Sequence, residues 1–397
     1  MVVKLVLLLV SSLCASSALS HTKQKHPDVG LNAKQVIQKY GYPLEVHFIE
    51  TEDGYILEYH RIPHGKNNAV GGHPVLLMPG LLSNSADFLT LGPGLSLGYI
   101  LADEGYDVWL ANYRGSRWSK KHKTLDVVVN KKEFFDISFQ EIGLYDITAS
   151  IDYILNTTGY KKLFYIGHSQ GTTCMFALLA AKPEYNDKIV LMTALAPIAY
   201  TTHVNYLMFL FTKHFLTEMQ QFSEAHGIYE FFPYSPLLTE LGQILCNDDV
   251  GTQPLCEAMF YFFGGYSSNL NKTVIPVILS NTPSGCTLRM MYHLVQIALS
   301  GQFQMYDFGE QENLIRYGQV SPPKLDLTQI TAPVELYYAD QDPVSTVKDV
   351  ELLAADLPNI VKKQFMNGYN HLDYLWSLNV ESVLYSHIIQ SIKNYST

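Results

Sequence analysis

Short apolar runs alternate with longer stretches of helical periodicity along most of the chain. An Asp53-Gly54 turn between strand-forming residues predicts a hairpin within residues 51–62. The later apolar runs are interpreted as buried strands at residues 75–78, 106–110, 163–166, 189–194 and 334–339. Helical stretches such as residues 144–155 separate them. This alternation predicts an α/β fold with a mostly parallel sheet covered by helices on both faces.

The alternation breaks off between about residues 199 and 323. Aromatic and aliphatic side chains fill residues 206–211 and 259–263, and strand signals are few. We therefore predict a core made of residues 21–198 and 324–397. The segment between them is expected to be a largely helical insertion over the edge of the sheet.

The first 20 residues have the pattern of a secretory signal peptide. Lys4 precedes an apolar stretch at residues 5–10, and small residues follow as far as Ser20. That apolar stretch is well short of the ~20 residues that a membrane span needs, and we find no later span. The mature protein is expected to be soluble and to be secreted or lysosomal. Three glycosylation sequons fit this route, at Asn156, Asn271 and Asn394.

Composition limits the possible partners. Hydrophobic residues make up 47% of the chain and charged residues 16%, as in a globular protein with a substantial core. The formal net charge of −10 disfavours nucleic acid as a partner and provides no attraction to anionic lipid. No cofactor and no metal ion is expected.

Five cysteines occur, and Cys14 belongs to the predicted signal peptide. Cys246 and Cys256 are close in sequence within a polar stretch, and in an oxidising compartment they are expected to form a disulfide. Cys174 lies on a predicted helix and is expected to be a buried thiol, and Cys286 has no obvious partner.

The pentapeptide Gly167-His168-Ser169-Gln170-Gly171 follows the strand at 163–166 and precedes a helical stretch at 172–181. A serine on such a sharp strand-to-helix turn has an exposed hydroxyl group that can attack an ester carbonyl. Glycines suit this turn because side chains at their positions would collide. The pentapeptide alone is a weak pattern, but its flanking strand and helix make Ser169 the predicted nucleophile.

An α/β-hydrolase site needs an acid and then a histidine after the nucleophile in chain order. The strand at 334–339 leads into Asp340 and Asp342, and His371 lies near the C-terminus. We predict His371 as the base and Asp342 as the acid that orients it, with Asp340 as the alternative. Either carboxylate could instead cap the following helix. His387 lies in an amphipathic stretch and is interpreted as structural.

The oxyanion hole of such a site requires two backbone N–H groups. One is predicted from Gln170, the residue after the nucleophile. The other is predicted from Leu81, in the loop after the strand at 75–78.

At this point the chain resembles the acid lipase family, which includes gastric lipase and lysosomal acid lipase. The resemblance covers almost the whole mature chain and is carried by residues 51–57, 106–110, 167–173 and 369–373. It implies an α/β-hydrolase core with a cap and lid over the active site, and hydrolysis of triacylglycerols or cholesteryl esters at a lipid–water interface. Matched residue by residue, it implies the same nucleophile, acid, base and oxyanion donors, and the Cys246–Cys256 disulfide.

The chain departs from the family pattern at three positions. Pro79 stands where these lipases commonly have histidine, and Cys174 and Cys286 are not family cysteines. None of these removes a catalytic group.

Three functions follow from these residues. The main hypothesis is a serine lipase that forms an acyl-enzyme on Ser169. The second is a carboxylesterase with the same chemistry that acts on small soluble esters. The third is an inactive lipid carrier or storage protein on the same fold, which would be expected to have lost members of the triad.

Overall fold

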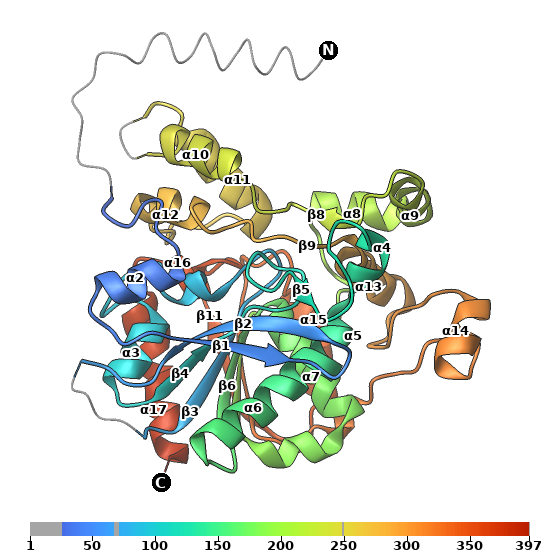
Figure 1. The fold of residues 1–397 in the computed structure, drawn as a ribbon, viewed down its shortest axis with the longest axis horizontal. Coiled ribbons are helices and arrows are strands. Elements are labelled where there is room, and N and C mark those ends of the chain that lie inside the picture. The colour runs from blue at the N-terminus through green and yellow to red at the C-terminus, as the bar shows by residue number, and fades with distance from the viewer. Residues whose placement is uncertain (1–25, 67–70, 248–249, 397) are drawn as a thin grey trace.

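The computed structural model describes residues 26–66, 71–247 and 250–396 (Figure 1). The predicted signal peptide lies outside these residues. Within them, the main sheet has nine strands in the order β1-β2-β4-β3-β6-β7-β10-β11, and β5 pairs with β2. The strands are β1 (Glu45–Glu50), β2 (Tyr55–Ile62), β3 (Pro74–Met78), β4 (Asp107–Leu110), β5 (Lys121–His122), β6 (Leu163–His168), β7 (Ile189–Leu195), β10 (Val334–Ala339) and β11 (Ile360–Met366).

The sheet is antiparallel at one edge and parallel elsewhere. β1, β4 and β5 each pair antiparallel with β2, and all pairs from β4 through β11 are parallel. Gly54 has φ +97° in the turn between β1 and β2, where the hairpin was predicted. The predicted mostly parallel α/β sheet is confirmed. β11 was not predicted, because Lys362, Lys363 and Gln364 interrupt its apolar residues.

Helices cover both faces of the sheet (Figure 1). The residues of β3 are buried on both faces of the sheet, in two hydrophobic clusters. Val75 and Leu77 belong to the first cluster, and Leu76 and Met78 belong to the second. The first cluster includes residues of α2 (Ala33–Lys39), α3 (Leu97–Asp103) and α17 (Ser386–Tyr395). The second includes residues of α6 (Thr148–Thr158), α7 (Gln170–Ala181) and α15 (Val347–Asp356). Strands buried on both faces account for the continuous apolar runs in the sequence.

Shorter helical elements complete the core. They are η1 (Ser85–Phe88), α4 (Lys131–Phe134), α5 (Phe139–Glu141), η2 (Ile142–Ile147), η3 (Pro183–Lys188), η5 (Leu327–Gln329), α16 (Asp373–Trp376) and η6 (Glu381–Tyr385). In the part of the chain that is described, no helix is both long and apolar enough to cross a membrane.

Between β7 and β10 the described chain is mainly helical, and most of it lies beyond one end of the sheet (Figure 1). Its elements are α8 (Leu207–His214), α9 (Leu216–Ala225), β8 (Glu230–Phe231), α10 (Pro236–Leu245), α11 (Gln253–Gly264), η4 (Lys272–Val274), α12 (Ile275–Leu279), β9 (Cys286–Thr287), α13 (Leu288–Ser300) and α14 (Glu310–Tyr317). We call residues 199–323 the covering segment.

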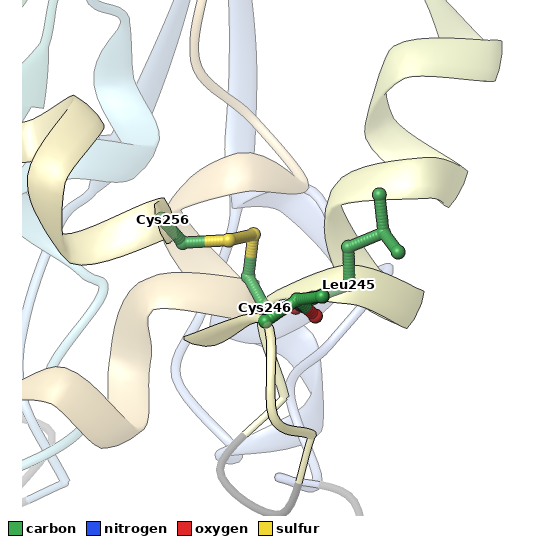
Figure 2. The surroundings of a disulfide bond; sticks show 4 residues. Leu245, Cys246 and Cys256 are labelled. Carbon is green, nitrogen blue, oxygen red and sulfur yellow. Dashed lines mark hydrogen bonds between the residues drawn. A yellow bond between two sulfur atoms is a disulfide. The ribbon is translucent and has the colours of Figure 1, made fainter. Parts of the chain in front are cut away.

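A disulfide joins the chain after α10 to α11 within the covering segment (Figure 2). It links Cys246 and Cys256, whose Cα atoms are 5.7 Å apart, as the sequence predicted. The other two described cysteines, Cys174 and Cys286, are buried and form no disulfide. The bond ties α10 to the helix whose other end reaches the candidate active site.

The three sequons differ in exposure. Asn156 at the end of α6 and Asn394 in α17 are exposed. Asn271 is partly buried, and its side-chain oxygen accepts a hydrogen bond from the Thr273 amide at 3.2 Å. Glycosylation at these positions remains a prediction.

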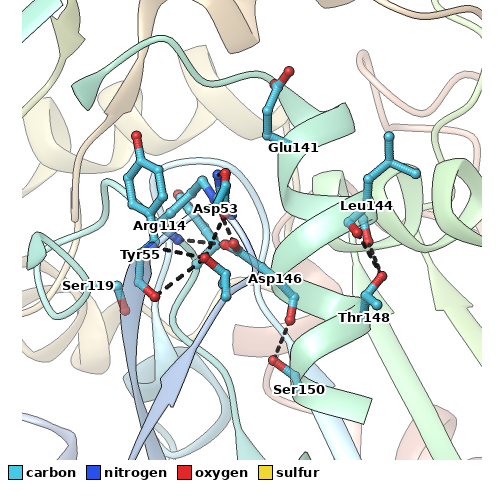
Figure 3. Close-up of polar contacts among 12 residues, drawn as sticks. Asp53, Tyr55, Arg114, Ser119, Glu141, Leu144, Asp146, Thr148 and Ser150 are labelled. Atoms are coloured by element: carbon cyan, nitrogen blue, oxygen red, sulfur yellow. Dashed lines mark hydrogen bonds and ion pairs between the residues drawn. The ribbon is translucent and has the colours of Figure 1, made fainter. Parts of the chain in front are cut away.

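A buried arginine anchors the β1–β2 hairpin to the helical face of the core (Figure 3). Arg114 follows β4 and is 1% exposed. Its Nη2 donates to Asp53 in the hairpin turn at 2.8 Å, and its Nε donates to Asp146 in η2 at 2.5 Å. The guanidinium carbon also lies 4.1 Å from the centre of the Tyr55 ring. Arg114 thus forms ion pairs with two carboxylates, and the Asp146 side chain is fully buried.

We predict that Arg114→Met will lower the free energy of unfolding by about 3–5 kcal/mol, because it leaves the Asp146 carboxylate buried without a cation. Urea unfolding of the variant measures this loss. Lys123→Met is the matched control, since Lys123 and Glu50 form an exposed ion pair whose loss should cost less than about 1 kcal/mol. Equal losses in the two variants would contradict the prediction.

Candidate active site

Ser169 occupies a strained turn between β6 and α7. Its φ of +53° is unusual for a residue with a side chain. The flanking glycines permit the turn, because a Cβ at Gly171 would lie 2.6 Å from the Met78 carbonyl oxygen. A Cβ at Gly167 would lie 2.9 Å from the Gly171 carbonyl carbon. Strain of this kind is concentrated at functional sites, and here it presents the Ser169 side chain at the carboxyl end of a central strand.

Three side chains from distant loops form one hydrogen-bonded relay. Ser169 Oγ lies 2.7 Å from His371 Nε2, and His371 Nδ1 lies 2.7 Å from Asp342 Oδ2. The exposed fractions of Ser169, Asp342 and His371 are 5%, 4% and 8%. The structure therefore brings together the three residues that the sequence selected, in a site that is largely closed to solvent.

The two candidate acids after β10 have different partners. Asp342 Oδ1 accepts hydrogen bonds from the amides of Val344 and Ser345 at 2.8 Å each, which leaves Oδ2 for His371. Asp340 is exposed, and its Oδ1 accepts the Gly368 amide at 2.7 Å. Neither carboxylate caps α15, because the Thr346 side chain does so. Asp342 is thus the acid beside His371.

The predicted oxyanion donors lie next to Ser169. Gln170 is the first residue of α7, so its N–H has no acceptor within the helix. Leu81 follows Gly80, where a Cβ would lie 3.1 Å from Ser169 Cβ. The neighbouring Leu82 has φ +64°, another sign of a constrained backbone. The loop that carries Leu81 therefore lies against Ser169, and the oxyanion role of the two amides stays a prediction.

The covering segment contacts the histidine loop directly. The His371 amide donates to the Gly264 carbonyl at 2.9 Å, and Asn370 Nδ2 donates to the Gly265 carbonyl at 2.7 Å. A Cβ at Gly264 would lie 2.6 Å from Leu372 Cγ. The end of α11 therefore packs against the loop that carries the candidate base.

Sequence reasoning gave no role to two residues of this site, His168 and Asn370. His168 Nε2 donates to the His371 carbonyl at 2.8 Å. Each residue directly precedes a member of the relay, and that adjacency was the available signal. His387, the other late histidine, lies exposed on α17 and away from this network.

A buried carboxyl group lies in η1, which directly follows the loop that carries Leu81. Asp87 is 3% exposed, its Oδ1 accepts the Thr282 hydroxyl at 3.2 Å, and no partner is found for its Oδ2 among the described residues. Burial raises the pKa of Asp87 to about 7. Thr282 belongs to the covering segment, so this carboxyl group lies where the segment meets the oxyanion loop.

Two family models match the chain. Residues 33–92 match the partial alpha/beta-hydrolase lipase region, and residues 73–236 match the alpha/beta hydrolase fold. Among solved structures, the alpha/beta hydrolase GrgF from Penicillium is similar, with a TM-score of 0.52 and 15% identity over 89% of this chain and 98% of that one. The protein is an α/β hydrolase.

Its relatives define the family more narrowly. The gastric triacylglycerol lipase of Bos taurus is 38% identical over 370 residues, which cover 92% of each chain. The human lysosomal acid lipase/cholesteryl ester hydrolase is 34% identical over 377 residues, which cover 93% of this chain and 92% of the relative. "Lipase 1" of Drosophila melanogaster is 38% identical over 91% of this chain and 80% of its own. The chain belongs to the family of gastric and lysosomal acid lipases, and it is a carboxylic ester hydrolase.

We predict that Asp87→Asn will stabilise the protein more at pH 7.5 than at pH 4.5. The folded-state pKa of Asp87, about 7, exceeds the ordinary value of 3.8, so the folded state retains a proton that the unfolded state releases between these values. Stability from this group is therefore present at low pH and is lost as pH rises towards 7. Because one pKa unit corresponds to about 1.4 kcal/mol, we expect the stabilisation at pH 7.5 to exceed that at pH 4.5 by about 3 kcal/mol.

Urea unfolding of both proteins at the two pH values measures this difference. A difference in unfolding free energy that does not change with pH would contradict the prediction.

Proposed function

We propose that the protein is a serine lipase that hydrolyses neutral lipids, triacylglycerols or cholesteryl esters, through an acyl-enzyme on Ser169. The observation that carries this proposal is the relay from Ser169 through His371 to Asp342, with 2.7 Å at each step. Serine, imidazole and carboxylate in this order form the machinery of acyl transfer in serine hydrolases.

In the acylation step, His371 Nε2 takes the proton of Ser169 Oγ while that oxygen attacks the ester carbonyl. The Leu81 and Gln170 amides donate to the oxyanion that forms. His371 then returns the proton to the leaving alcohol as the ester bond breaks. Water, activated by His371, hydrolyses the acyl-enzyme and releases the fatty acid. Asp342 keeps Nδ1 of His371 protonated and stabilises the imidazolium form.

A lipid substrate is supported by the surface of the covering segment. Most of the exposed large apolar side chains among the described residues belong to this segment. A hollow of about 480 Å³ between α8, α9 and α13 is lined mainly by apolar side chains, including Phe211, Phe215, Phe222 and Tyr292. Exposed apolar side chains that gather in one segment are typical of proteins that contact lipid or another partner.

The burial of the relay adds a second requirement. A triacylglycerol cannot reach a serine that is 5% exposed unless part of the covering segment moves. We propose that this segment is the cap and lid of the enzyme, and that it opens at a lipid–water interface.

The names of the relatives support the same substrate class, since they include triacylglycerol lipases and a cholesteryl ester hydrolase. We also propose that the protein follows the secretory pathway, to the cell exterior or the lysosome. The predicted signal peptide and the disulfide of the covering segment support this route.

The second candidate is a carboxylesterase for small soluble esters, which the same relay could serve. The apolar covering segment favours the lipase. The intact relay argues against an inactive lipid carrier.

We predict higher specific activity on emulsified long-chain triglyceride or cholesteryl ester than on a dissolved short-chain ester. Initial rates on the three substrates, measured across pH, test this prediction. Ser169→Ala is the control, and it should lose about 10⁴-fold or more of the activity because no acyl-enzyme can form. Activity confined to the dissolved ester would favour the carboxylesterase, and full activity of the variant would overturn the proposed mechanism.

The acid can be tested with two neighbouring carboxylates. We predict that Asp342→Asn lowers kcat by about 10⁴-fold, because the amide no longer holds the imidazole in the required tautomer. Asp340→Asn is the matched control and should retain kcat within about twofold, since Asp340 bonds to Gly368 and not to His371. Steady-state kinetics on a soluble ester measures both. Similar losses in the two variants would contradict the assignment.

A further inference from the structure

His168, the residue before the candidate nucleophile, connects three parts of the active site. It is the last residue of β6, and its exposed fraction is 2%. Its Nε2 donates to the His371 carbonyl at 2.8 Å, and the two imidazole rings lie 5.1 Å apart. On the other side, a Cβ at Gly80 would lie 3.0 Å from His168 Nδ1. The ring therefore fills the space between the oxyanion loop and the histidine loop.

The protonation state of His168 suits this position. A carbonyl oxygen only accepts hydrogen bonds, so Nε2 must carry the proton. Nδ1 is buried and has no partner among the described residues. Burial, followed by the charge of His371, lowers the pKa of His168 to about 3. A neutral ring adds no positive charge beside the imidazolium that forms on His371 during the reaction.

The main chain of His371 is held from two sides. Its N–H donates to Gly264 in the covering segment, and its carbonyl accepts from His168 in the core. His371 itself follows β11, the strand at the edge of the sheet, whereas Ser169 follows β6 inside it. If the covering segment moves, the Gly264 contact moves with it. His168 is the last residue of β6 and directly precedes Ser169. Its bond to His371 therefore stays fixed relative to the nucleophile when the covering segment moves.

We propose that His168 is a positioning residue that aligns the His371 imidazole with the Ser169 hydroxyl through its hydrogen bond to the His371 carbonyl. The inference rests on the proposed function, because it assigns a role within the same relay. His168 touches neither substrate nor the reacting atoms in this role. Misplacing a catalytic group by about 1 Å can reduce the rate by roughly 10²-fold.

The test uses three variants on a dissolved short-chain ester, with a serine-directed phosphonate to count competent active sites. His168→Phe keeps a planar ring and removes the donor. His168→Gln places an amide N–H about where Nε2–H lies. His293→Phe is the matched control, because His293 is also buried, also donates Nε2 to a carbonyl, that of Gln304 at 2.9 Å, and also has an unpartnered Nδ1. It stacks on Phe139 instead of contacting the relay.

For His168→Phe we expect kcat per titrated site to fall about 10- to 100-fold with KM within twofold. His168→Gln should recover most of that loss, and His293→Phe should keep the wild-type kcat per site. A His168→Phe enzyme with wild-type kcat per site would overturn the inference. It would also be overturned if the only effect were fewer titratable sites, or if His293→Phe lost as much kcat. A wild-type protein that neither hydrolyses the ester nor takes up the phosphonate would instead overturn the proposed function.

Discussion

The hydrogen bond between Ser169 and His371 spans 202 residues of sequence, and the arrangement of the sheet makes it possible. β6, β7, β10 and β11 are parallel neighbours, so their carboxyl ends lie along the same side of the sheet. The loops after β6, β10 and β11 carry the serine, the acid and the histidine. A change in strand order would separate these loops, so the chemistry depends on the topology before it depends on any single side chain.

The covering segment contacts the core at these same carboxyl ends of the strands. Gly264 and Gly265, at the end of α11, accept hydrogen bonds from the two residues His371 and Asn370. The disulfide lies in the same helix, near its other end. One helix of the covering segment therefore carries the disulfide and also contacts the loop of His371. In the proposed mechanism, in which the covering segment opens at a lipid–water interface, the hydrogen bond from His168 holds His371 from the side of the core.

Two buried carboxyl groups of the core, Asp146 and Asp87, differ in whether a cation lies beside them. Arg114 and Asp146 are closed off from water, whereas Asp53 is exposed. The hydrogen bonds of Arg114 to both carboxylates fasten the hairpin to the helical face. Asp87 is equally buried and has no cation among its partners, so burial favours its neutral form. A carboxyl group of this kind lowers stability as pH rises, and it sits where the oxyanion loop meets the covering segment.

Local patterns and short spacings in the sequence were enough to predict the buried strands, the turn at Ser169 and the cysteine pair. The order of serine, acid and histidine could be read directly along the chain. The sequence favoured Asp342 as the acid but kept Asp340 as an alternative, since two carboxylates two positions apart differ only in the groups that they contact. It also missed β11, whose lysines hide the strand, and the contacts of His168 and Gly264 with His371. Those contacts join residues more than 100 positions apart, and only the packing of the folded chain decides them.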